Sequence, residues 1–128
     1  MLALALEDGL PAGEIQIPPT IQGLLTARLD RLEPQERAVI DRASIQGKVF
    51  NEEAISALAP RELSTAVADS LGSLLRKQLI RADRPTFGGR TYRFRHILIR
   101  DSAYESIPKE ARADLHEGFG RWLETAAS

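Results

Sequence analysis

The side chains of this chain that could do chemistry are two histidines and a few scattered carboxylates. His96 and His116 are the only imidazoles, and no cysteine or carboxylate stands around them at a metal-binding or catalytic spacing. Asp69, Asp101 and Glu105 likewise show no spacing that would pair an acid with a base. The chain has no Gly-x-x-x-x-Gly-Lys-Ser/Thr loop and no Gly-x-Gly-x-x-Gly motif. We therefore expect no enzymatic activity, and no metal or cofactor bound by the chain itself.

Positive charge is concentrated in one part of a chain that is nearly neutral as a whole. The 128 residues include 17 Lys or Arg and 18 Asp or Glu, which argues against a uniformly polyanion-binding protein. Between residues 76 and 100, however, eight cations stand against one aspartate, a formal charge of about +7. Arg81, Arg84, Arg90 and Arg93 lie there in a predicted hairpin. They could contact phosphate or an acidic partner, or simply keep a solvated hairpin edge from aggregating.

His96 lies where the hydrophobic pattern changes from that of a strand to that of a helix. Apolar residues alternate up to position 94 and then follow a helical period, at Ile99, Ala103 and Ile107. A helical wheel places His96 on the same side as these three, so we expect its ring to face inward. A histidine at such a junction usually caps the helix or hydrogen-bonds in the core. His116 is interpreted as a partly buried structural residue.

The elements that position these residues are mainly helices. We expect four helices before a two-stranded hairpin and two after it. The predicted helices cover about residues 18–32, 34–47, 51–59, 62–77, 97–107 and 108–124, and the hairpin strands cover 79–84 and 90–95, with a further short strand at 15–17. Three helices followed by a hairpin is the order of a winged helix. The predicted fold is therefore mainly α, winged-helix-like with a two-stranded β-hairpin wing, followed by two C-terminal helices.

The first and last predicted helices each have an apolar stripe that we expect to be buried. The first stripe consists of Ile21, Leu24, Leu25, Leu29 and Leu32, and the last of Ala111, Leu115, Phe119, Trp122 and Leu123. No cysteine, signal peptide or membrane span is evident in the sequence. A cytoplasmic protein with no membrane partner is the expectation.

Three stretches resemble segments of the STAND class of signalling ATPases, including those fused to adenylate or guanylate cyclase or to transcription-regulator domains. Residues 94–105 match a pattern F-R-H-x-L-I-R-D-x-x-Y-E, residues 17–32 contain I-P-P-T and A-R-L-D-R-L, and residues 36–50 match E-R-x-V-L-x-x-A-x-x-x-G-x-x-F with Ile40 in place of its leucine. More distantly, His-Ile-Leu-Ile-Arg-Asp from His96 is similar to the Met-His-Asp motif region of NB-ARC proteins.

This resemblance implies a non-catalytic regulatory winged-helix module cut from a larger ATPase that binds ATP and ADP. Its partners would be the nucleotide-binding domain and a helical repeat domain of the same polypeptide. Residues 1–17 would be a tail from the ATPase domain, 18–95 the winged-helix-like domain, and 96–128 a helical pair leading toward the repeats.

The resemblance also assigns roles to individual residues. His96 would sense the nucleotide phosphates, although Ile97 stands where the Met-His-Asp motif has its acid. Arg95, Arg100, Asp101 and Tyr104 would be interface or structural residues, and we expect the Arg100 stem to pack near Tyr104 while its guanidinium finds an acceptor.

The alternative function is DNA binding by a winged helix, with residues 62–77 in the major groove and the hairpin arginines on phosphates. The exposed first half of that helix argues against it, because Glu62, Ser64, Thr65 and Asp69 are not the residues that usually read base edges.

Overall fold

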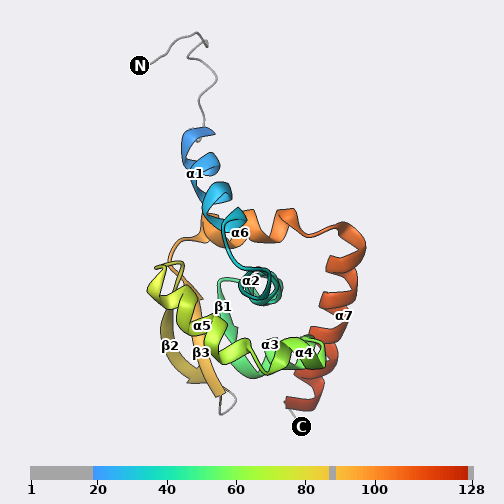
Figure 1. Ribbon diagram of the computed structural model, residues 1–128. Helices are drawn as coiled ribbons and strands as arrows, with labels where there is room; N and C mark the ends of the chain where they lie inside the picture. The colour runs from blue at the N-terminus through green and yellow to red at the C-terminus, as the bar shows by residue number, and fades with distance from the viewer. Residues whose placement is uncertain (1–18, 87–88, 127–128) are drawn as a thin grey trace, which may run out of the picture.

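The computed structural model describes residues 19–86 and 89–126, and the predicted strand at 15–17 and the tail at 1–17 lie outside these ranges. The described part is mainly helical, which confirms the predicted class (Figure 1). Its elements are α1 Pro19–Asp30, α2 Pro34–Gln46, β1 Val49–Asn51, α3 Glu52–Leu58, α4 Arg61–Ser64, α5 Val67–Arg76, β2 Ile80–Thr86, β3 Gly89–Phe94, α6 Ile97–Ser106 and α7 Lys109–Ala126.

The hairpin belongs to a three-stranded antiparallel sheet with strand order β1-β3-β2. β2 and β3 lie where the hairpin was predicted, with Ile80 opposite Phe94. The two-stranded wing was wrong in one respect, because β1 adds a third strand that pairs Phe50 with Tyr92. β1 has three residues, too few for an alternating pattern to reveal it. Apart from the one-turn helix α4 between α3 and α5, the resulting order of α2, β1, α3, α5 and hairpin is winged-helix-like.

The core lies between the inner face of the sheet and the helices packed around α2. Figure 1 shows α2 near the middle of the domain, with α6 and α7 around it and the sheet and α5 on the side away from α7. Phe50 packs against Phe94 with ring centroids 5.0 Å apart and against Tyr92 at 5.9 Å. α6 contributes Ile99 and Ala103 to the same core, so the first helix after residue 95 packs with the elements before it.

Local signals explain where α2 and α3 begin and end. Pro34 opens α2, the Glu33 amide donates to Glu36 Oε1 at 2.9 Å, and Gly47 ends the helix with a φ of 120° that disfavours other residues. Asn51 caps α3 as predicted, because its Oδ1 accepts from the Glu53 amide at 2.7 Å and from the Ala54 amide at 3.2 Å.

The single helix predicted over residues 62–77 was wrong, because it is divided into α4 and α5. Ala66 leaves the helical conformation, with φ −102° and ψ 1°, and its amide bonds to the Leu63 carbonyl. The resulting turn lets Leu63 and Val67 both enter the core. The domain consequently has five described helices before the hairpin where four were expected.

The two outermost helices bury less of their apolar stripes than the sequence suggested. In α1, Leu29 is buried, but Ile21 is 44% and Leu24 is 65% exposed. Figure 1 shows α1 projecting beyond the rest of the domain. No described residue of α7 is fully buried, and Leu123 is exposed. Each helix lies at the edge of the domain with neighbours on one side, so only part of each apolar stripe is covered.

Candidate functional site

His96 connects β3 to α6 and caps the helix. Its backbone is extended, with φ −146° and ψ 139°, and its Nδ1 accepts a hydrogen bond from the Leu98 amide at 3.1 Å. The capping interpretation is confirmed. The expected inward orientation was wrong, since His96 is exposed while Ile99 and Ala103 are buried. His96 precedes the first helical turn and its backbone is extended, so the helical wheel does not give the direction of its side chain.

The cap bond determines which ring nitrogen of His96 can donate. Because Nδ1 accepts, the neutral imidazole must carry its proton on Nε2. Within the described residues Nε2 has no hydrogen-bond partner, and the neighbouring Arg95 and Ile97 are exposed. The junction therefore presents an oriented N–H donor beside a guanidinium and an apolar side chain.

Arg100 is half-buried where α6 contacts α2. Its Nε donates to the Ser44 carbonyl at 2.9 Å, and its Nη1 lies 3.3 Å from Asp101 Oδ1. The guanidinium carbon stands 4.3 Å from the centre of the Tyr104 ring, a cation–π contact. The predicted proximity of Arg100 to Tyr104 is confirmed, and this geometry ties α6 to α2.

Tyr104 also links α6 to α7. Its hydroxyl lies 2.8 Å from His116 Nε2, and the Arg112 guanidinium carbon lies 4.8 Å from the ring centre. Tyr104 thus contacts Arg100 as well as Arg112. His116 is exposed, so the expectation that it is partly buried was wrong, although its contact with Tyr104 is a structural one.

The hairpin arginines do not form one site. Arg81 and Arg93 are opposite each other in the register of β2 and β3, and Arg93 Nε lies 3.4 Å from Asp83 Oδ2. Arg81, Arg84, Arg90 and Arg95 are exposed. The charge block is therefore spread over the hairpin, with Arg93 partly neutralised.

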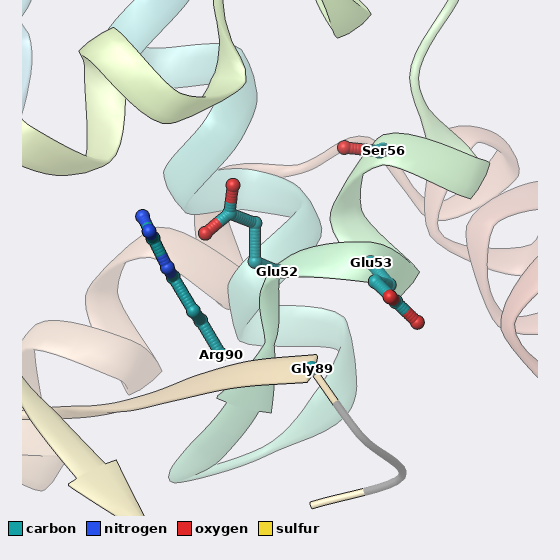
Figure 2. A pocket seen from close by; sticks show the side chains of 5 residues that line it. All are labelled: Glu52, Glu53, Ser56, Gly89 and Arg90. Atoms are coloured by element: carbon teal, nitrogen blue, oxygen red, sulfur yellow. The ribbon is translucent and has the colours of Figure 1, made fainter. Parts of the chain in front are cut away.

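Arg90 lies at a pocket of about 380 Å³ that is lined by Glu52, Glu53, Ser56, Gly89 and Arg90. Figure 2 shows Arg90 extending alongside Glu52, while Glu53 points away from both. Glu52 also accepts from the Tyr92 hydroxyl at 3.3 Å. Burial, followed by the negative charge of Glu52, raises the pKa of Tyr92. Two carboxylates stand against one guanidinium in this lining, a formal charge of −1, so the pocket does not suit an anionic ligand such as a phosphate.

A second pocket, of about 290 Å³, lies where the end of α1 meets the end of α5. It is lined by Arg28, Arg31, Leu32, Lys77 and Leu79. Arg28 Nη2 donates to the Lys77 carbonyl at 2.5 Å and so joins the two helices. Lys77 belongs to the charge block predicted from the sequence, but Arg28 of α1 and Arg31 just after it were not predicted as site residues. Their spacing of three residues, within the helix predicted over residues 18–32, is the signal that could have revealed them.

Glu36 lies behind this pocket and balances Lys77. Lys77 Nζ donates to Glu36 Oε1 at 2.8 Å, and the Ser73 hydroxyl donates to Oε2. Burial raises the pKa of Glu36, but the hydrogen bonds from Lys77, Ser73 and the Glu33 amide and the charge of Lys77 outweigh burial and lower it overall. The uncompensated cations at the pocket are therefore Arg28 and Arg31.

Some kinds of site are not found in the part of the chain that the structure describes. Residues 19–86 and 89–126 hold no group of three or more His, Cys, Asp or Glu that could bind a metal ion. Within those ranges, none of the helices has the length and apolar character that crossing a bilayer requires. Comparison of the chain with protein-family models, curated proteins and solved structures finds no match. The resemblance to signalling ATPases rests on its motifs.

Proposed function

We propose that this chain is a non-catalytic regulatory module of a larger signalling ATPase. It packs on the nucleotide-binding domain of the same polypeptide and relays the nucleotide state to an effector domain. The observation that carries the proposal is the exposed His96 ring, oriented by its cap bond to Leu98 so that Nε2 can donate outward. The winged-helix-like order of the elements and the three motif resemblances support the same role.

An oriented donor can bias a switch if it reaches the nucleotide in one state of the protein only. A hydrogen bond to a charged phosphate is worth roughly 1.5–3 kcal/mol. That free energy changes an equilibrium constant by about tenfold or more. Ile97 replaces the acid of the Met-His-Asp motif and is 41% exposed, so an apolar contact with the ATPase domain would accompany the hydrogen bond.

The first test is the reading frame upstream of Met1. We expect it to encode a phosphate-binding loop of the Gly-x-x-x-x-Gly-Lys-Ser/Thr type. A frame that encodes no nucleotide-binding domain would contradict the proposal. The isolated chain should show no measurable affinity for ATP or ADP, because it would supply one contact among many.

The second test separates sensing from helix capping. Serine is a good N-cap residue but is too short to replace the imidazole, so His96→Ser should preserve α6 while it removes the Nε2 donor. In the polypeptide that contains the ATPase domain, stopped-flow measurement of a fluorescent ADP analogue should show release about tenfold faster than wild type. Release at the wild-type rate, with an unchanged melting temperature, would assign His96 to capping alone.

DNA binding is the alternative function, and the exposed arginines of the hairpin favour it. α5 does not, because the exposed side chains in its first half are Ala68 and Asp69, which offer no donor to a base edge. We expect weak binding to unrelated duplexes that falls steeply as salt rises and shows little sequence preference. A strong preference for one sequence that survives at the higher salt concentration would establish the alternative.

A further inference from the structure

α1 and the turn that follows it carry exposed side chains that the domain leaves uncovered. Leu25, Leu29 and Leu32 pack on the core, whereas Ile21, Leu24, Arg28 and Arg31 are exposed. These four recur at helical spacing, so they form one stripe that runs beside the leucines packed on the core. The stripe is apolar in its first half and cationic in its second half.

The cationic half of this stripe leads into the pocket of about 290 Å³ at the end of α5. Its lining consists of cations and leucines, with no carboxylate. Arg28 is oriented by its bond to the neutral Lys77 carbonyl, and the Arg31 side chain has no acceptor among the described residues. Because Glu36 neutralises Lys77, the two arginines supply the uncompensated charge.

We infer that Ile21, Leu24, Arg28 and Arg31, together with the pocket, form a docking surface for an acidic protein segment. A carboxylate would bind between Arg28 and Arg31, where guanidinium groups favour paired hydrogen bonds. A leucine-like side chain of the same segment would cover Leu24 and Ile21. The apolar half of the surface favours a protein over a nucleic acid, since phosphates would use the arginines alone. The inference rests on the proposed function in that the segment would belong to a domain this module contacts.

The surface can be tested on the 128-residue chain without knowledge of its partner. A library of random 12-residue peptides would be selected on the wild-type protein and counter-selected on Arg31→Glu. We expect the enriched peptides to be acidic and to contain leucine or a similar residue. No enrichment, or enrichment of neutral or basic peptides, would overturn the inference.

The affinity of an enriched peptide for variants of the protein, measured by fluorescence anisotropy, then shows which residues form the surface. Arg31→Glu should weaken binding about tenfold or more and Leu24→Ser severalfold, both at an unchanged melting temperature because both side chains are exposed. Arg61→Glu, the same charge change at an exposed position of α4, is the matched control and should bind as wild type does. Equal losses in all three variants would show a general charge effect and overturn the assignment.

Two competitors distinguish the other possible occupants. If single-stranded oligo(dT) binds and loses affinity with Arg31→Glu but not with Leu24→Ser, the surface is a phosphate site and the inference is wrong. If a synthetic peptide of residues 1–17, which include Glu7, Asp8 and Glu14, displaces the selected peptide, the occupant belongs to this chain and not to a partner. Neither result depends on His96, so this surface and the nucleotide-sensing role can fail separately.

Discussion

The carboxylate of Glu36 should be one of the more important polar groups for the stability of this domain. It is 6% exposed and accepts from the Glu33 amide, the Ser73 hydroxyl and Lys77 Nζ. These donors join the start of α2 to the last turns of α5. Glu36→Gln keeps the size of the side chain but removes its charge.

The structure allows the cost of this substitution to be bracketed. Hydrogen bonds to a charged acceptor are worth roughly 1.5–3 kcal/mol, against about 0.5–1.5 for neutral ones. The Lys77 side chain is 44% exposed, so the ion pair itself adds less than about 1 kcal/mol. We expect Glu36→Gln to lower the free energy of unfolding by roughly 1–2 kcal/mol near neutral pH. Urea unfolding followed by circular dichroism would measure it.

The pH dependence provides the decisive check. The pKa of Glu36 in the folded protein lies below its ordinary value of 4.5, so its contribution is complete above that value and is lost as pH falls through the folded pKa. The stability difference between wild type and Glu36→Gln should therefore shrink in acid. Glu62→Gln, at an exposed position, should change stability by less than about 0.5 kcal/mol. An equal difference between wild type and Glu36→Gln at about pH 3 and about pH 7 would refute this reasoning.

Three further variants test other parts of the fold. Gln78 has a φ of 63°, a left-handed conformation that is strained for a residue other than glycine. Gln78→Gly should therefore stabilise the end of α5 by up to about 1 kcal/mol and raise the melting temperature, and a lower melting temperature would contradict this reasoning. His96→Ala should lower the free energy of unfolding by about 1 kcal/mol because the α6 cap is lost, whereas His96→Ser should lower it much less. Equal losses for the two variants in urea unfolding would exclude capping. Burial raises the pKa of Asp41 despite Arg37 and Arg42, so the charge of Asp41 lowers stability at neutral pH and Asp41→Asn should stabilise the domain there. The advantage should shrink as pH falls through the raised pKa and be gone below the ordinary value of 3.8, and an advantage that persists below that value would point to another cause.

The end of α5 shows why some features could not be predicted from the sequence. Its three final bonds are the Gln78 amide to the Leu75 carbonyl, the Leu79 amide to the Leu74 carbonyl, and Arg28 to the Lys77 carbonyl. The first two form a Schellman motif, which usually has glycine where Gln78 stands. No local sequence pattern indicates the Schellman motif, and the third bond joins residues 49 positions apart. Propensity and periodicity are local, so they cannot detect such a contact.

The better predictions depended on residues whose effect is local. Pro34, Gly47 and Asn51 act on the backbone around them, and each marks the helix end that the sequence suggested. The exposure of the α1 stripe could not be predicted, because it depends on distant parts of the chain. Periodicity correctly places its leucines on the helix, but the burial of Ile21 and Leu24 depends on how far the rest of the domain extends.

A backbone contact links the proposed docking surface to the histidine junction. Leu79 lines the pocket beneath α1, and its carbonyl accepts from the amide of Arg95, the residue before His96, at 3.1 Å. A single backbone hydrogen bond therefore joins a residue of the docking surface to the residue before His96. If the proposed ATPase domain contacts both, an acidic segment would lie against Arg28 and Arg31 and the nucleotide phosphates would lie near His96. In such an arrangement the docking surface would provide affinity in either nucleotide state, while only the histidine contact would depend on the nucleotide, and only a contact that differs between states can shift their populations.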